Sequence, residues 1–297
     1  MTRSLETLWN PITPDAAPQG FAAPLIMGVV NVTPDSFSDG GLYEQHQAAV
    51  EHALQLIEEG ADIIDIGGES TRPPGTDYGA GSAAVTAGQE MERVIPVIEA
   101  IRRERPGMEI SIDTMKPDVA EEAVRAGATI INDVSAGRYD VRIMTVAAEH
   151  DLPCILMHGH DPANRVPVDE ITYDDVVADV LGFLEERIAA ARRAGVRRVI
   201  ADTGIGFAKR AEESARLIRE QRRFLELGVP LLVGASRKSF IGRMLGGLPP
   251  AERLYGTIAA HAVAALNGAS IVRVHDVRPA RQFFSVFEQL FRGPEPR

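Results

Sequence analysis

The sequence has almost no cysteine: Cys154 is the only one among 297 residues. One cysteine excludes an internal disulfide and fits a reducing compartment, and its place in an apolar run favours a packing role. Uninterrupted apolar stretches are also short, because Gly, Asp or Arg breaks each one well before the ~20 residues that span a bilayer. Residues 1–24 are rich in Pro and polar residues and lack the apolar segment of a signal peptide. We therefore expect a cytoplasmic protein without a membrane partner.

Net positive charge is missing as well, since the formal net charge is −11. Nucleic acids and anionic membranes are bound by clustered Lys and Arg, so we expect no nucleic-acid partner. A phosphorylated ligand would need a local group of basic residues on this acidic chain.

The chain does contain eight short apolar runs, rich in β-branched residues and roughly evenly spaced. With their polar ends, these runs cover residues 25–31, 63–72, 109–114, 129–135, 154–160, 198–207, 230–238 and 270–276. Helical patterns follow them at residues 45–59, 83–105, 117–126, 141–149, 173–194, 212–227, 251–267 and 279–291. This alternation predicts an α/β fold, a (β/α)8 TIM barrel in a single domain at residues 25–297, preceded by an N-terminal extension at residues 1–24.

Two connections from strand to helix are long, at residues 32–44 and 67–82. In a barrel these connections lie at the carboxyl ends of the strands, where lids and binding loops are found. The alternative is a pair of surface insertions without a role in binding.

Four polar residues follow the third, fourth, sixth and seventh runs: Asp113, Asn132, Asp202 and Lys238. In a barrel their side chains converge on one rim. Carboxylate, amide and ammonium groups together suit a heterocycle with several hydrogen-bond donors and acceptors. Alternatively these residues satisfy one another and cap the following helices, as Asp113 would do before Lys116.

A second set is cationic and consists of Arg72, Arg273 and His275. Arg273 and His275 lie two residues apart on the last run and so share one face of a strand. Guanidinium groups bind phosphate oxygens in a bidentate manner, which predicts an anion site. The alternative is a salt-bridge network with Asp276 or Glu69.

His158 and His160 have a spacing that can hold a metal ion. A catalytic metal site usually needs three or more protein ligands, and no third one is evident, so the sequence disfavours this interpretation. The glycines at residues 204–207 lack the full fingerprint of a nucleotide-binding loop and indicate little about phosphate binding.

From about residue 25 to residue 291 the chain resembles the dihydropteroate synthases, the pterin-binding enzymes of the folate pathway. The most specific segment is NVTPDSFSDGG at residues 31–41. Further segments match in the expected order: GGESTRP at 67–73, GIGFAK at 204–209, GASRKSFIG at 234–242 and RVHD at 273–276.

The resemblance implies that 6-hydroxymethyl-7,8-dihydropterin diphosphate condenses with p-aminobenzoate to give 7,8-dihydropteroate and pyrophosphate. Asp113, Asn132, Asp202 and Lys238 would hold the pterin ring, with Met157 lining its pocket. The expected catalytic residues are Asp113, Asp202, Lys238 and Arg273.

The resemblance further implies that Arg72, Arg273 and His275 hold the diphosphate, and that Asn31 coordinates the Mg2+ carried with it. The p-aminobenzoate site would include Thr71, Phe207, Ser236 and Arg237. It also implies a homodimer formed through the outer helices of the second half.

The chain departs from the family pattern at Thr203, where Pro is usual, at Pro74, which lengthens the second long loop, and at Gly159 with His160. These residues flank the expected pocket, so we predict altered loop packing and retained activity. Two other functions remain open: a non-catalytic pterin-binding paralogue, and a pterin-dependent methyltransferase-type barrel that works with a cobalamin partner.

Overall fold

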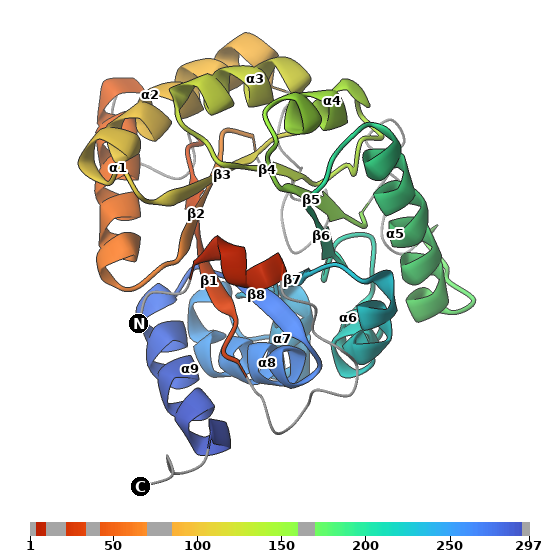
Figure 1. The fold of residues 1–297 in the computed structure, drawn as a ribbon. Coiled ribbons are helices and arrows are strands. Elements are labelled where there is room, and N and C mark those ends of the chain that lie inside the picture. Colours follow the sequence, from red (N-terminus) through yellow and green to blue (C-terminus); the bar gives the residue numbers. More distant parts are fainter. Residues whose placement is uncertain (1–3, 10–21, 34–41, 70–84, 160–169, 293–297) are drawn as a thin grey trace, which may run out of the picture.

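The eight apolar runs form parallel strands that close into one barrel in sequence order, with helices around it (Figure 1). The computed structural model describes residues 4–9, 22–33, 42–69, 85–159 and 170–292. The strands are β1 (Leu25–Asn31), β2 (Ile63–Gly67), β3 (Glu109–Asp113), β4 (Ile130–Asp133), β5 (Cys154–Met157), β6 (Val199–Asp202), β7 (Leu231–Val233) and β8 (Ala269–Val274). The predicted (β/α)8 barrel is confirmed.

The outer layer of the barrel consists of α-helices. They are α1 (Leu42–Glu58), α2 (Ala87–Glu104), α3 (Pro117–Ala126), α4 (Arg142–Glu149), α5 (Val176–Arg193), α6 (Ala211–Arg219), α7 (Ser239–Met244), α8 (Leu254–Leu266) and α9 (Val277–Arg292). Within the described ranges there are nine rather than the expected eight, because the six-residue α7 follows β7 and precedes α8. No helix in this part of the chain is both long and apolar enough to cross a bilayer.

The helix expected at residues 212–227 is wrong in its second half. The α-helix ends at Arg219, and a 3-10 helix, η4 (Gln221–Leu227), follows. Its buried residues are Gln221, Phe224 and Leu227, which are three apart. This spacing matches the three residues per turn of a 3-10 helix, so the tighter winding places all three against the core.

Alternation along the strands divides the barrel interior into two layers. Near the amino ends of the strands, the inward side chains form an apolar cluster that includes Met27, Ile63, Ile130 and Ile200. A short 3-10 helix, η1 (Leu5–Trp9), packs two leucines and a tryptophan against this cluster and is the red helix near the middle of Figure 1. The inward residues at the carboxyl ends of the strands are mostly polar.

Candidate active site

The strand register brings most of the predicted pterin-site residues to the carboxyl end of the barrel. Asp113 ends β3 and lies opposite Asn132 of β4, while Met157 ends β5 and lies opposite Asp202 of β6. On β8, Arg273 lies opposite Met27 of β1. Asn31 ends β1 at the same rim. Thr71, Arg72, Pro74 and His160 lie outside the described residues.

A buried carboxylate that the sequence analysis missed joins two of these side chains. The side chain of Asn132 donates to both carboxylate oxygens of Asp65, at 3.3 and 3.2 Å, and Arg273 Nη1 lies 3.2 Å from Asp65 Oδ2. Asp65 is only 2% exposed. The available signal was one charged residue inside the apolar run IIDIG, two positions before the strand end. The ion-pair partner of Arg273 is thus Asp65 instead of the considered Asp276 or Glu69.

Asp113 is partly buried beside this group, and its Oδ1 is shielded from solvent. Burial, followed by repulsion from Asp65, raises the pKa of Asp113 well above its usual range, although Arg273 opposes the shift. Among the described residues nothing hydrogen-bonds to Asp113 Oδ1 or to Asn132 Oδ1, although both atoms are buried. The helix after Asp113 begins with Lys116 as N-cap and has no side-chain cap, so the capping alternative for Asp113 is wrong. The two oxygens are well suited to accept hydrogen bonds from a ligand.

Asp202 starts the loop that carries Phe207. Its Oδ1 accepts a hydrogen bond of 2.7 Å from the backbone N–H of Gly204, which has a φ of +65°. The glycine makes this turn possible although position 203 is threonine. An added Cβ at Gly204 would lie 1.7 Å from the His158 carbonyl oxygen, so only glycine fits there.

A buried lysine, Lys209, fixes the same loop and was not identified from the sequence. Its ammonium donates to the carbonyl oxygens of Gly204 and Phe207, at 3.0 and 2.9 Å, and lies 2.8 Å from His158 Nδ1. Burial lowers the pKa of Lys209 to about 7. An ammonium donor beside the imidazole is unfavourable for a metal ion, and no group of three His, Cys, Asp or Glu in the described part could hold one.

The aromatic ring of Phe207 contacts both an apolar cluster and Lys238, which lies in the loop after β7. Phe207 packs on the cluster of Met115, Val134 and Met157. Lys238 Nζ lies 3.8 Å from the centre of the Phe207 ring and donates to the carbonyl oxygen of Ile205 at 2.6 Å. A planar ring system would find both an apolar surface and a cation here.

The loop after β7 and the end of β8 meet at the rim. Arg237 makes a bidentate pair with Asp276, at 2.9 and 2.6 Å. Ser236 Oγ accepts from the backbone N–H of His275 and lies 3.0 Å from His275 Nδ1. Arg237 therefore lies next to His275, one member of the predicted cationic set.

Glu69 takes part in an ion pair, and Cys154 is packed in the interior. Lys116 Nζ lies 2.5 Å from a carboxylate oxygen of each of Glu69 and Glu90, at the base of the second long loop. Burial raises the pKa of the Cys154 thiol, which agrees with the expected packing role.

The chain matches the pterin binding enzyme family over residues 27–275. It is 47% identical over 256 residues to the dihydropteroate synthase of Bacillus subtilis, with 86% of this chain and 84% of that protein covered. The Xanthomonas albilineans dihydropteroate synthase solved with 4-aminobenzoic acid is 45% identical and superposes with a TM-score of 0.83, with 92% of this chain and 95% of that chain covered. The same enzyme in complex with 7,8-dihydropteroate gives 43% identity and a TM-score of 0.80, over 94% of this chain and 99% of that chain. The chain belongs to the pterin-binding enzyme family and, within it, to the dihydropteroate synthases.

Proposed function

We propose that this chain condenses 6-hydroxymethyl-7,8-dihydropterin diphosphate with p-aminobenzoate, releasing pyrophosphate and forming 7,8-dihydropteroate. The observation that carries the proposal is the buried polar layer at the carboxyl end of the barrel, where Asp113 and Asn132 each present an oxygen without a partner in the described part. Asp202 and Arg273 complete this layer. A chain of this family with an intact layer has the groups that a bicyclic ring with several N–H donors requires.

The pterin ring would be held by hydrogen bonds to Asp113, Asn132 and Asp202, and by Lys238. Phe207 and Met157 supply an apolar surface next to these groups. Because the polar groups are buried, a ligand that lacks the matching donors would leave them unsatisfied, at a cost of about 1–3 kcal/mol for each group.

In the reaction the C–O bond between the pterin methylene and the diphosphate breaks, and a C–N bond to the amine of p-aminobenzoate forms. The amine then loses a proton. Positive charge develops on the methylene and negative charge on the leaving pyrophosphate, so the cationic groups at the rim stabilise the departing anion. We assign this role to Arg273 and His275 from their position, and to Arg72 from the resemblance.

We further propose an SN1-like displacement with ordered binding, in which the diphosphate substrate binds first. Product-inhibition kinetics test this order. Productive binding of p-aminobenzoate to enzyme without pterin or pyrophosphate would contradict it.

The donor set at the rim fits a Mg2+ ion that arrives with the diphosphate. Asn31 offers an amide oxygen at the end of β1, and the described residues contain no acidic or histidine cluster that would hold the ion alone. Mg2+ commonly binds to proteins through substrate phosphates, water and few protein oxygens. The ion would neutralise diphosphate charge, and Asn31 would orient it.

We also propose a homodimer through the outer helices of the second half. Large apolar side chains on α7 and α8 are exposed there: Tyr255 by 86%, Met244 by 62% and Leu266 by 39%. Sedimentation analysis of the purified protein tests this state, and a monomer at micromolar concentration would contradict it.

A pyrophosphate-release assay with both substrates tests the function directly. We expect release that depends on p-aminobenzoate and Mg2+, with 7,8-dihydropteroate formed in equal amount. Pterin binding without turnover would instead identify a non-catalytic paralogue. Methyl transfer to a corrinoid partner would identify the methyltransferase alternative.

A further inference from the structure

The loop between β7 and α7, residues 234–238, carries three predicted site residues in a row: Ser236, Arg237 and Lys238. Its backbone is strained at Arg237, which has a φ of +57°. A residue with a side chain adopts this left-handed conformation at a cost, and the surrounding structure must hold it there. The Arg237 side chain is tied to Asp276, but that pair does not fix the backbone turn itself.

The backbone of this loop is held by one face of α8. Thr257 Oγ1 accepts a hydrogen bond of 3.0 Å from the N–H of Arg237, and His261 Nε2 accepts one of 3.1 Å from the N–H of Ala235. Arg253, the N-cap of α8, donates from Nη1 to the carbonyl oxygen of Arg237 at 2.9 Å. The three side chains are spaced four residues apart, so they project from the same face of the helix.

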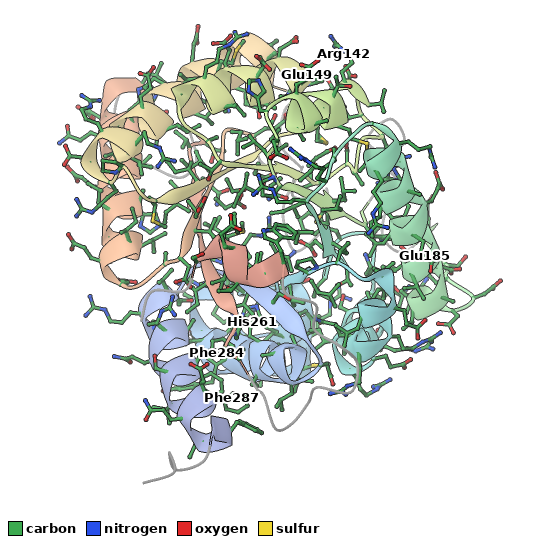
Figure 2. All side chains as sticks on the ribbon, in the orientation of Figure 1. Arg142, Glu149, Glu185, His261, Phe284 and Phe287 are labelled. Carbon is green, nitrogen blue, oxygen red and sulfur yellow. The ribbon has the colours of Figure 1, made fainter. Side chains whose placement is uncertain are left out.

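Two of these three side chains, Thr257 and His261, are buried, and burial keeps the His261 imidazole in its neutral form. Thr257 and His261 are 2% and 0% exposed, and Figure 2 labels His261 on α8 beside the strands. Burial lowers the pKa of His261 to about 3, so the imidazole stays neutral and Nε2 remains an acceptor at neutral pH. An added Cβ at Gly242 would lie 2.5 Å from Arg253 Nε and Nη2, so a glycine in α7 leaves room for this guanidinium.

We propose that Arg253, Thr257 and His261, which we name the α8 clamp, are positioning residues for the arylamine side of the active site. The clamp fixes the left-handed turn at Arg237 and thereby orients Ser236 and Arg237, the two residues of this loop expected at the p-aminobenzoate site. None of the three need touch a substrate. This inference rests on the proposed function for its kinetic readout and on the observed hydrogen bonds for its structural readout.

The decisive variant is Thr257→Val, which keeps the shape of the side chain and removes the acceptor. We expect the KM for p-aminobenzoate to rise about tenfold, since the half-buried N–H of Arg237 loses its partner. The pterin site depends mainly on Asp113, Asn132 and Asp202, which belong to strands, so pterin affinity should change less than about threefold. Thr257→Ser restores a hydroxyl and should return the KM to within about twofold of the parent.

Thr129→Val is a matched control. Thr129 Oγ1 also accepts a backbone hydrogen bond, 3.1 Å from the N–H of Ile110, but it lies at the amino end of the barrel. This variant should lower Tm without changing the KM for p-aminobenzoate. A KM unchanged in Thr257→Val, no rescue by serine, or an equal KM rise in Thr129→Val would overturn the proposal.

Amide hydrogen exchange makes the test independent of activity. Exchange at Arg237 N–H should accelerate at least tenfold in Thr257→Val and stay slow in Thr257→Ser; equal rates in parent and valine variant would overturn the clamp. If the parent shows no turnover, the proposed function fails while the exchange result still decides the clamp. If Thr257→Val does not fold, Arg253→Lys tests the same turn, because lysine keeps the charge and loses the planar guanidinium.

Discussion

The two ends of the barrel interior are formed by the same strands. Their inward side chains are apolar at the amino end and mostly polar two residues later, at the carboxyl end. On β4, β6 and β8 the lower inward residues are Ile130, Ile200 and Ile271, which belong to the apolar cluster. The inward residues two positions later are Asn132, Asp202 and Arg273. We call the apolar packing at the amino end of the barrel the lower layer, and the buried polar residues at the carboxyl end the upper layer.

This contrast separates stability from chemistry along the axis of the barrel. Apolar residues at the lower end are satisfied by one another and by η1. The upper layer instead leaves buried oxygens of Asp113 and Asn132 without partners in the described part, which lowers stability in the absence of a ligand. Substitutions in the lower layer should therefore change folding, and substitutions in the upper layer should change binding.

The largest effect is expected for Arg273→Ala, in the upper layer. The change removes the guanidinium that is proposed to bind the diphosphate, and it leaves Asp65 buried without its ion pair. We therefore expect kcat/KM to fall by on the order of 10³, which corresponds to about 4 kcal/mol. Calorimetry with the pterin diphosphate and with a pterin that lacks phosphate measures the split. The first affinity should fall and the second should be nearly unchanged.

A matched control for Arg273→Ala is Arg281→Ala on α9. Arg281 also pairs with a buried aspartate, at 2.5 Å from Asp62, but outside the barrel interior. The Arg281→Ala variant should have a lower free energy of unfolding than the parent and the same affinity for the pterin diphosphate. Equal losses for both pterin ligands in Arg273→Ala would remove Arg273 from the anion site.

The second largest effect is expected for Ile200→Ala, in the lower layer. Ile200 is fully buried, and truncation should lower the free energy of unfolding by about 3 kcal/mol, which corresponds to a fall in Tm of roughly 5 °C. Thermal unfolding measures the loss, and kinetics at low temperature should give unchanged KM values. A raised KM without a change in Tm would contradict the separation of the two layers.

Asp202→Asn, on the same strand, should show the opposite behaviour. The amide keeps an oxygen that can accept from Gly204 but loses the charge offered to the pterin, so pterin affinity should fall by about 2 kcal/mol. The expected change in Tm is smaller than that for Ile200→Ala. Pterin binding equal to the parent would exclude Asp202 from the pocket.

The sequence was sufficient to predict the barrel because its signals are local and repeated. Each strand is an apolar run, each is followed by a helical pattern, and polar residues mark the carboxyl ends. α3 matches its predicted bounds, since Pro117 begins the helix and Gly127 ends it in the left-handed conformation. Convergence of Asp113, Asn132, Asp202 and Arg273 followed from the fold alone.

The features that sequence reasoning missed depend on contacts between distant residues. Asp65 acquires its role from Asn132 and Arg273 across the barrel, and Lys209 from carbonyl oxygens of a folded loop. The short helix α7 has too few residues for a periodic signal. The clamp on α8 has regular spacing, yet only the position of the neighbouring loop shows what its side chains bind.

The smallest effect, and the sharpest test of the upper layer, is expected for Asp113→Asn. The pKa of Asp113 is raised by burial first and by Asp65 second, so above the usual aspartate pKa of about 4 the folded chain retains a proton that the unfolded chain has released. The stability of the parent should therefore decrease as pH rises through the window between the two pKa values. Asparagine cannot ionise, so the variant lacks this contribution.

Thermal unfolding of both proteins from about pH 4 to about pH 8 measures the difference. The Tm of Asp113→Asn relative to the parent should increase with pH across this window, while its turnover falls because the pterin loses a carboxylate partner. Parallel Tm curves would show that Asp113 ionises normally in the fold. The polar layer would then carry no stability cost at this position, and the contrast with the apolar layer would hold for packing alone.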